Sequence, residues 1–336
     1  MKAGISRAEL VEAYSMSAVQ EVYGGPLALT NLKWILGTRG DIWVIRGDLE
    51  PHVHNAKGFV APYLFKRVEA KMRECPGHSL FDGVGPSSLE AHHFFAQLYG
   101  RRMVFVVARE DELPPHVASW QNTEIIRADE IAEWGYVRKQ AEVLHTRKDI
   151  IPLRQAEYGA WAMARIGNRV VRELEARRVR PDASVWVAAS GSNLWGIGGK
   201  LKDRFSSETI LVTKTVHVER GDLYDENKMR TRAREMLRQY SFRNPSVSIS
   251  EADFRVSPLH MVLPSLSLLR LIAHTGKPGL DQVEIVTDEE RERVQEHLRL
   301  SGFDWTGTTA MALVKAIQLA NEGKTVVAMV YGVNQN

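Results

Sequence analysis

One stretch decides the fold: Val185-Trp186-Val187-Ala188-Ala189-Ser190-Gly191-Ser192-Asn193-Leu194-Trp195-Gly196-Ile197-Gly198-Gly199. Its apolar beginning predicts a buried strand, and apolar residues recur at helical spacing from Leu194 to Leu201 after a small polar turn. A strand, a small-residue turn and a helix can hold a phosphate group, because the free N–H groups of the helix N-terminus point at the anion. Ser190, Ser192 and Asn193 add side-chain donors. Most strand-to-helix turns bind nothing, so this turn alone does not establish a phosphate site.

Length and composition limit the class of protein. The chain has 336 residues, 44% of them hydrophobic and 25% charged, which is typical of soluble globular proteins and sufficient for two domains with full cores. The net charge of +3 is too small to indicate a nucleic-acid partner. The single cysteine, Cys75, excludes an internal disulfide and suits a reducing compartment. Because residues 1–9 lack an apolar core and no apolar stretch could span a bilayer, we expect a cytoplasmic protein without a membrane partner.

Strand and helix patterns alternate along the chain. Strands are predicted at 42–45, 79–81, 103–107, 124–126, 185–187, 210–212, 283–286 and 326–330. Helices are predicted at 7–23, 57–72, 91–98, 130–144, 155–178, 226–240, 288–300 and 307–321. Thr287 and Glu290 form a capping box before the helix at 288–300, which Gly302 ends. This alternation predicts an α/β fold with parallel strands.

Two further features lie in the first hundred residues. Lys57 stands where a polar loop meets a helix, a place where a lysine is ordinarily a solvated side chain. A second small-residue turn, Asp82-Gly83-Val84-Gly85-Pro86-Ser87-Ser88, opens another helix. Its N–H groups can hold a substrate carboxylate, and a plain connecting turn is the alternative.

The histidines and the basic residues carry weaker signals. His52 and His54 flank Lys57 and suit either an acid–base or a structural role, whereas His92 and His93 are expected at a helix surface or core edge. The basic helix at 226–240 is expected to be a solvated face, with attraction of an anionic substrate as the alternative. No His, Cys or carboxylate spacing is typical of a metal site, so none is expected.

Taken in order, these turns and the lysine resemble the pyridoxal-phosphate enzymes of fold type II, the tryptophan synthase β type, which includes threonine synthase, serine/threonine dehydratase and cysteine synthase. The resemblance runs from about residue 22 to the C-terminus. It rests on Tyr23-Gly24-Gly25-Pro26, Asp48-Leu49-Glu50-Pro51 with Lys57 shortly after, the stretch 79–107, Ser190-Gly191-Ser192-Asn193 with Gly196, Val286-Thr287-Asp288-Glu289-Glu290, Gly302-Phe303-Asp304-Trp305-Thr306-Gly307 and Val327-Ala328-Met329-Val330-Tyr331-Gly332.

The resemblance implies a two-domain α/β fold with three α/β/α layers. Residues 1–61 and 172–336 would form the large cofactor-binding domain, and 62–171 the small mobile domain of a homodimer. Pyridoxal 5'-phosphate would lie between the domains on Lys57, which is also the implied catalytic residue. The implied cofactor-binding residues are Lys57, Ser87, Ser190, Gly191, Ser192, Asn193, Thr306 and Tyr331, and the implied substrate-binding residues are Gly85, Ser87 and Ser88.

The chain departs from the family pattern at three places. Ser87 stands where the family has the asparagine that faces the phenolic oxygen of the cofactor. Gly58-Phe59 replaces the Asp-Arg that usually follows the lysine. Tyr331 stands where relatives carry Ser, Thr or Cys beside the pyridine nitrogen, and Thr306 or Thr308 is the alternative partner for that nitrogen.

The activity implied by the resemblance is that of a lyase or transferase of amino-acid metabolism. It would perform elimination or replacement at the β- or γ-carbon of a small amino acid, as threonine synthase and cysteine synthase do. One alternative is a non-catalytic member of the fold that acts as a binding or partner subunit, motivated by the altered Gly85–Ser88 turn and by Tyr331. Another is a nucleotide-binding α/β enzyme using the 189–193 turn, although no Gly-x-Gly-x-x-Gly turn with a fitting downstream acid supports it.

Overall fold

The computed structural model describes residues 27–109, 113–128, 133–187, 191–214 and 281–334 and contains two sheets. The larger sheet has the strand order β1-β2-β10-β7-β8-β9. Its strands are β1 (Leu29–Asn31), β2 (Ile42–Arg46), β7 (Ala183–Val187), β8 (Glu208–Lys214), β9 (Gln282–Val286) and β10 (Val326–Val330). All neighbouring pairs are parallel except β1 with β2. The predicted α/β class with parallel strands is therefore confirmed.

The smaller sheet is inserted in the chain between β2 and β7. Its four parallel strands have the order β5-β4-β3-β6. They are β3 (Ser79–Gly83), β4 (Met103–Val107), β5 (Thr123–Arg127) and β6 (Ile150–Pro152). All five residues of the central strand β4, Met-Val-Phe-Val-Val, are buried. A continuous apolar run of this kind is what a parallel strand covered on both faces requires.

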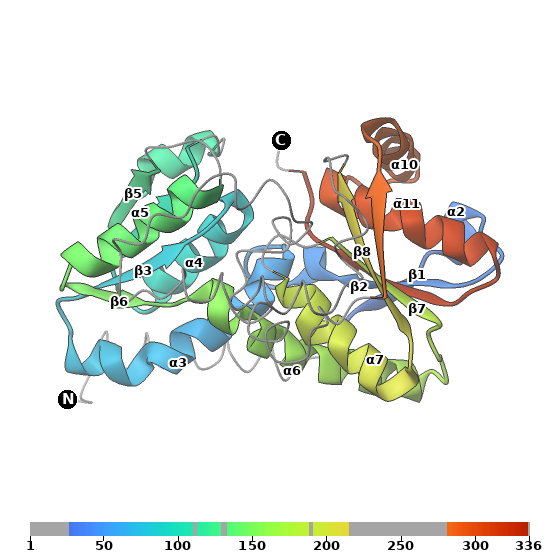
Figure 1. Ribbon diagram of the computed structural model, residues 1–336, viewed down its shortest axis with the longest axis horizontal. Helices are drawn as coiled ribbons and strands as arrows, with labels where there is room; N and C mark the ends of the chain where they lie inside the picture. The colour runs from blue at the N-terminus through green and yellow to red at the C-terminus, as the bar shows by residue number, and fades with distance from the viewer. Residues whose placement is uncertain (1–26, 110–112, 129–132, 188–190, 215–280, 335–336) are drawn as a thin grey trace, which may run out of the picture.

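Helices cover both sheets. The helices of the smaller sheet's part of the chain are α3 (Ala61–Glu74), α4 (Pro86–Leu98), η3 (Pro115–Ser119) and α5 (Glu133–Thr146). Those of the larger sheet's part are α2 (Lys33–Leu36), α6 (Gln155–Ala176), η4 (Leu194–Gly198), α7 (Gly199–Phe205), α10 (Asp288–Leu300) and α11 (Gly307–Asn321). In Figure 1, α10 and α11 lie above the larger sheet and α6 and α7 below it, so this sheet is the middle layer of three.

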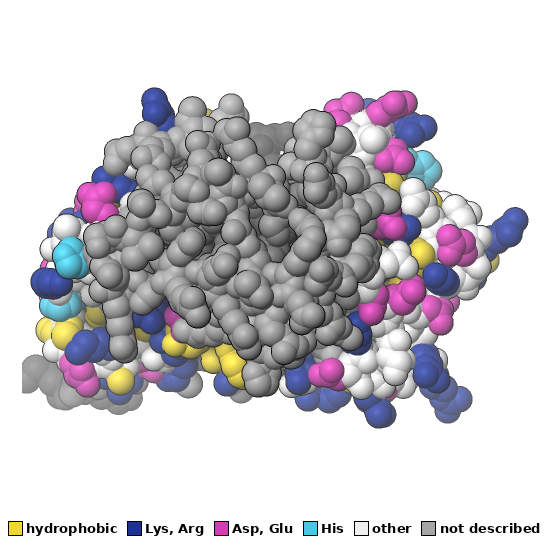
Figure 2. Space-filling model, viewed as in Figure 1, with side chains coloured by type: hydrophobic (Ala, Val, Ile, Leu, Met, Phe, Trp, Pro, Cys, Tyr) yellow, Lys and Arg dark blue, Asp and Glu magenta, His cyan; other side chains and the backbone are white. Residues whose placement is uncertain are grey.

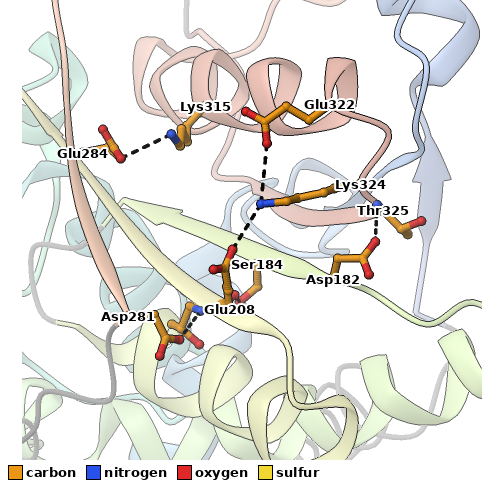
Figure 3. A network of polar contacts seen from close by, with 10 residues as sticks. Asp182, Ser184, Glu208, Asp281, Glu284, Lys315, Glu322, Lys324 and Thr325 are labelled. Carbon is orange, nitrogen blue, oxygen red and sulfur yellow. Dashed lines mark hydrogen bonds and ion pairs between the residues drawn. The ribbon is translucent and has the colours of Figure 1, made fainter.

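The N-terminal ends of the larger sheet's strands are tied together by polar contacts (Figure 3). Asp182, just before β7, accepts a hydrogen bond from the backbone N–H of Thr325, just before β10, at 2.8 Å. Lys324 forms ion pairs with Glu208 at 3.5 Å and with Glu322 at 3.6 Å. These contacts hold together the N-terminal ends of the strands. The opposite side of the sheet, where the strands have their carboxyl ends, is left to carry a site.

Several local features differ from the sequence-based predictions. The helix expected from Lys57 onward is a short 3₁₀ helix, η2 (Ala56–Phe59), followed by α3. Pro62 lies in the first turn of α3, and its missing N–H and its ring prevent one α-helix from running through both segments. The turn at Leu194–Gly198 is a π-helix, and β1, α2 and β6 were not predicted. The expected helices at 7–23 and 226–240 lie outside the described residues.

Other predicted details agree with the structure. Thr287 and Glu290 form the predicted capping box, in which each side chain accepts from the other residue's backbone N–H. The expected domain boundary at 171–172 falls within α6, which runs unbroken from Gln155 to Ala176. The division into domains therefore stays a prediction, although the two separate sheets match its general outline.

The described surface has a mixed charge. Figure 2 shows basic and acidic side chains interspersed around the rim of one face, a pattern typical of a solvated surface. None of the helices in the described part of the chain combines the length and the apolar character that a bilayer crossing requires. Within the same residues, no group of three or more His, Cys, Asp or Glu side chains is placed to hold a metal ion.

Candidate functional site

The segment that carries Lys57 is anchored to the carboxyl end of the central strand β10. Asn55 precedes η2, and its side chain accepts a hydrogen bond from the backbone N–H of Lys57 at 2.8 Å. The backbone N–H of Ala56 donates to the carbonyl oxygen of Tyr331 at 3.0 Å. Asn55 and Gly332 also form an isolated antiparallel bridge. The backbone around Lys57 is thus held in place, while the lysine side chain is left to reach away from the larger sheet.

A buried ion pair fixes the start of the same loop. Asp48, in the 3₁₀ helix η1 (Gly47–Leu49), accepts two hydrogen bonds from the guanidinium group of Arg46, at 2.8 and 2.7 Å. The indole N–H of Trp305 donates to Asp48 as well, at 3.1 Å. The bidentate pair holds Asp48 in place, and the Trp305 hydrogen bond joins the loop to the segment before α11. These contacts give a physical role to the aspartate of the Asp48–Pro51 motif.

Glu50 explains why the residue after Lys57 is a glycine. The buried Glu50 carboxylate accepts hydrogen bonds from the backbone N–H groups of His52 at 3.1 Å and Val53 at 2.7 Å. A Cβ atom at Gly58 would lie 2.0 Å from Cδ of Glu50, so a side chain there would displace the Glu50 carboxylate from its two backbone donors. The glycine at position 58, where the family has aspartate, therefore goes together with Glu50, whose side chain fills the space beside Gly58.

Lys57 reaches toward the smaller sheet. Its side chain is partly buried, and burial lowers the pKa of the Lys57 amine to about 8, opposed by the negative charge of Asp82. Asp82 lies in β3 of the smaller sheet. The pKa of the Asp82 carboxyl is raised to about 7 by burial, opposed by hydrogen bonds from backbone N–H groups. The charges of Lys57, from the segment anchored to the larger sheet, and Asp82, from the smaller sheet, thus interact with each other.

Asp82 also holds the N-terminus of α6. It accepts hydrogen bonds from the backbone N–H groups of Gln155 and Gly83, each at 3.0 Å. Sequence reasoning used Asp82 only as the start of a turn and did not identify it as a site residue. The sequence did contain a signal. Asp82 directly follows the predicted strand Ser79-Leu80-Phe81, and an acidic side chain at the end of a buried strand is almost never buried unless it has a partner.

His92 is the second site residue that the sequence did not identify. We expected His92 at a helix surface or core edge, and the structure places it in the core with 0% exposure. Its ring is 3.8 Å from a carboxylate oxygen of Asp82, measured from Nδ1. Its position three residues before Phe95, on the inward face of α4, was the available signal. His93, by contrast, is half-buried and stacks on Trp120, with ring centroids 4.0 Å apart.

The histidines beside Lys57 take separate positions. The ring of His52 stacks on Phe94, with centroids 5.2 Å apart and an interplanar angle of 20°, and it meets Phe95 edge-on. His54 is exposed and has a left-handed backbone with φ of 53°. The packing of His52 favours the structural one of the two roles considered for it.

In the part that the structure describes, the small-residue turn after β7 leads into a helical segment, which is the π-helix η4. Gly191 has φ of +72°, a conformation that favours glycine. Ser192 is buried against α6, where a Cβ at Gly159 would lie 2.5 Å from its Oγ. Asn193 immediately precedes η4. Ser190 lies outside the described residues.

Close backbone packing places this turn. A Cβ at Gly196 would lie 2.5 Å from Cβ of Met163 and 2.7 Å from the carbonyl oxygen of Ala160. At Gly167 a Cβ would lie 2.8 Å from the carbonyl oxygen of Gly196. Glycines on both partners therefore let η4 and α6 touch through their backbones. Because the first residue of α6, Gln155, donates a backbone hydrogen bond to Asp82 of β3, the same helix links the turn to the smaller sheet.

The Tyr331 side chain spans two strands. Its hydroxyl accepts a hydrogen bond from the backbone N–H of Val187 at 2.8 Å and donates to the carbonyl oxygen of the same residue at 3.0 Å. It also hydrogen-bonds with the side chain of Asn193, and burial raises the pKa of the Tyr331 phenol well above its usual value. The one proton of this hydroxyl is thus directed at β7.

The threonines near Tyr331 hold its backbone. Thr306 precedes α11, and its hydroxyl lies 3.2 Å from that of Thr309. The buried Thr309 hydroxyl accepts from the backbone N–H of Tyr331 at 3.0 Å. Thr308 is exposed. Thr309 was missed by sequence reasoning, since one threonine in an apolar helix gives no signal until its partner strand is known.

The predicted substrate turn opens α4 as expected. Gly85 immediately precedes this helix and is exposed, as is Ser87, whereas Ser88 is buried. Pro86 occupies the first turn of the helix and contributes no N–H. Fewer backbone donors remain at this helix N-terminus than a turn without proline would offer.

These residues gather at the carboxyl ends of β2, β10, β7 and β3. That edge is where α/β proteins with parallel sheets place their ligand sites. The arrangement defines an α/β protein of two parallel sheets with a lysine between them and a small-residue turn at the end of a central strand. Lys57, with its lowered pKa, could bind an aldehyde, and the Gly191–Asn193 turn could hold a phosphate; pyridoxal 5'-phosphate carries both groups.

Comparison with known proteins supports the architecture. No family model matches the chain, and no curated protein sequence matches it. Solved structures do match. A hydrogen sulfide-producing enzyme from Fusobacterium nucleatum has a TM-score of 0.65 at 12% sequence identity, covering 95% of this chain and 96% of that one. Cysteine synthase from Entamoeba histolytica has a TM-score of 0.65 at 13% identity, covering 94% and 87%.

A third solved structure is an O-acetylserine-dependent cystathionine β-synthase from Helicobacter pylori, with a TM-score of 0.65 at 16% identity and coverage of 94% of both chains. The chain therefore has the fold of the tryptophan synthase β-like enzymes, pyridoxal-phosphate fold type II. The predicted fold is confirmed.

Proposed function

We propose that this protein is a pyridoxal-phosphate-dependent enzyme that performs elimination or replacement at the β- or γ-carbon of a small amino acid. The observation that carries the proposal is the position of Lys57. This lysine comes from a segment anchored to the larger sheet, has a pKa lowered by burial to about 8, and interacts with the buried Asp82 of the smaller sheet. An amine with a lowered pKa is neutral in a useful fraction of molecules near neutral pH, as a nucleophile and a base must be.

The residues around Lys57 take distinct parts in this proposal. Lys57 would bind the cofactor covalently and later move the α-proton of the substrate. Gly191, Ser192 and Asn193 would hold the phosphate, in line with the left-handed glycine and the helical turn that follows. When bound, the cofactor supplies an electron sink for the substrate's α-carbon. Asp82, through its charge, would keep the Lys57 amine oriented while it holds a proton.

The hydroxyl of Tyr331 is not free to donate to a pyridine nitrogen, because its proton is directed at the carbonyl oxygen of Val187. A ring nitrogen without a donor stays mostly unprotonated, and this weakens the electron sink. Such a site favours elimination and replacement over transamination. The three structural neighbours described above are named for hydrogen sulfide production, cysteine synthesis and O-acetylserine-dependent cystathionine synthesis, so cysteine and O-acetylserine belong in the first test.

The test has two parts. Titration of the purified full chain with pyridoxal 5'-phosphate should produce a new absorbance band that depends on the lysine. A panel of serine, threonine, cysteine, O-acetylserine and O-phosphohomoserine, each assayed with and without added sulfide as the nucleophile for replacement, should then reveal at least one substrate through release of keto acid and ammonia, release of sulfide, or formation of a new amino acid. An absorbance band without turnover on any member would support a non-catalytic binding subunit. Absence of the band at saturating cofactor would overturn the proposed class.

The phosphate turn gives a sharp prediction. Gly191→Asp and Gly191→Asn introduce side chains of the same shape, and both residue types tolerate the left-handed backbone better than most. Only the aspartate places a negative charge beside the phosphate. We expect Gly191→Asp to bind pyridoxal 5'-phosphate at least about tenfold more weakly than Gly191→Asn, because a like charge nearby costs more than about 1.4 kcal/mol in a site poorly exposed to water.

The measurement for this turn is the dissociation constant from the spectral titration. Equal affinities for the two variants would mean that the phosphate does not lie at this turn. Pyridoxal, which lacks the phosphate, serves as the matched ligand control and should not distinguish the two variants.

A further inference from the structure

The buried histidine His92 is not explained by packing. It has 0% exposure, its ring lies parallel to that of Phe105 at 6.4 Å with an interplanar angle of 11°, and it meets Phe65 at 6.2 Å. Neither of its ring nitrogens has a hydrogen-bond partner among the described residues. A phenylalanine would suit these aromatic neighbours better, because a buried polar atom without a partner is unfavourable.

The polar groups near His92 come from three elements. Asp82 of β3 has a carboxylate oxygen 3.8 Å from Nδ1 of His92. Lys57 of η2 acts electrostatically on both His92 and Asp82. Of these two groups, Arg67 of α3 acts on Asp82 and not on His92. His92 is itself neutral, since burial and the Lys57 charge lower its pKa to about 3.

A neutral imidazole carries one N–H donor, and a carboxylate needs donors. The separation of 3.8 Å is longer than a hydrogen bond, so a small side-chain movement is required to form one. Asp82 already accepts from two backbone N–H groups, and a carboxylate has room for further donors. Each additional donor favours the charged carboxylate over the neutral acid.

We propose that His92 is a positioning residue for Lys57: its neutral ring donates to the Asp82 carboxylate, which in turn holds the protonated Lys57 amine. This inference rests on the proposed function, because it concerns the amine that would bind the cofactor. Without His92, the Asp82 carboxylate takes up a proton more readily, and Lys57 loses its counter-charge. The amine then becomes neutral at a lower pH.

The experiment follows the reactivity of Lys57 without the cofactor. The full chain, freed of pyridoxal 5'-phosphate, is reductively methylated with formaldehyde over a range of pH, and the Lys57 peptide is quantified by mass spectrometry. Only a neutral amine reacts, so the pH midpoint reports the Lys57 pKa. Lys66 and Lys71, which are exposed on α3, are internal references in the same sample.

We expect His92→Phe to lower the midpoint of Lys57 by about one pH unit, the lower end of the effect of an opposite charge nearby. Asp82→Asn should lower it at least as far, and His92→Phe added to Asp82→Asn should have no further effect, because the histidine acts through the carboxyl group. His92→Asn, which keeps an N–H near the position of Nδ1, should restore most of the wild-type midpoint. His93→Phe, one residue along the helix, is the matched control and should leave it unchanged.

An unchanged midpoint in His92→Phe, or a full additional shift in the double variant, would overturn the inference. Should His92→Phe fail to fold, His92→Leu supplies the same comparison. The result is separate from that of the cofactor titration. A shifted midpoint without any cofactor band would support the link between His92 and Lys57 and reject the proposed function. A cofactor band with an unshifted midpoint would support the proposed function and reject the link.

Discussion

Substitution of Lys57 by alanine should abolish both covalent attachment of pyridoxal 5'-phosphate and turnover. The side chain has two proposed parts, tether and base, and loss of a general base alone lowers a rate by about 100- to 10,000-fold. Loss of the tether adds to this, because the cofactor is then held by its phosphate contacts only. Borohydride reduction of the wild-type protein should leave a pyridoxyl group on the peptide containing Lys57, and the variant should carry no label there.

Two lysines of the adjoining helix provide matched controls for this experiment. Lys66 and Lys71 are exposed on α3, each paired with a glutamate on the same helix. Lys66→Ala and Lys71→Ala should keep the label and full turnover, because exposed ion pairs of this kind contribute little to stability. A label on either of these lysines in the wild-type protein would move the site away from Lys57, and retained turnover in Lys57→Ala would remove its catalytic role.

Substitution of Asp82 by asparagine should make the protein more stable at pH 8 and leave its stability nearly unchanged at pH 4. The Asp82 carboxyl has a pKa of about 7 in the folded chain and an ordinary value of 3.8. Between these values the folded state binds a proton that the unfolded state has released, so the stability of the wild type falls as the pH rises. Above pH 7, the difference between the two pKa values corresponds to roughly 4 kcal/mol in the free energy of unfolding. This is an upper bound, because asparagine does not reproduce every contact of the carboxyl group.

The measurement is the free energy of unfolding of both proteins in urea at several pH values from 4 to 8. The difference between Asp82→Asn and wild type should grow with pH across this range. Asp149→Asn is a suitable control, because that exposed carboxyl has its pKa lowered by hydrogen bonds from Arg147 and should show no such growth. A constant difference between Asp82→Asn and wild type would mean that Asp82 is already ionised at pH 4.

Much of the fold was predictable because it depends on local patterns. The apolar runs at Met103–Val107 and Val326–Val330 are wholly buried strands, and alternation with helices leaves only a parallel sheet as their arrangement. The capping box at Thr287 and Glu290 was predictable for the same reason, since it involves residues three apart on one helix. Lys57 and the turn around Gly191 were identified from their order along the chain, which resembles that of a known family.

Other features depend on contacts between distant residues. Asp82 and Gln155 are 73 positions apart, and Tyr331 and Val187 are 144 apart, so neither pairing leaves a pattern in the sequence. Gly58 departs from the family because the Glu50 carboxylate fills the space that a side chain would need. For His92 the sequence indicated only its position on a predicted helix. Its burial beside Asp82 is known only once β3, α4 and the Lys57 segment are packed together.

The α/β class and most of the alternating strands and helices were therefore predictable from the sequence, because they follow from short-range periodicity. The lysine and the turn proposed for the site were identified from the order of motifs, through the resemblance to a known family. Which groups surround that lysine depends on how the chain packs. Burial changes the pKa of Lys57 and Asp82, and burial is a property of the packed chain. Likewise, the proton of the Tyr331 hydroxyl is directed to β7 because β10 lies beside β7 in the folded sheet.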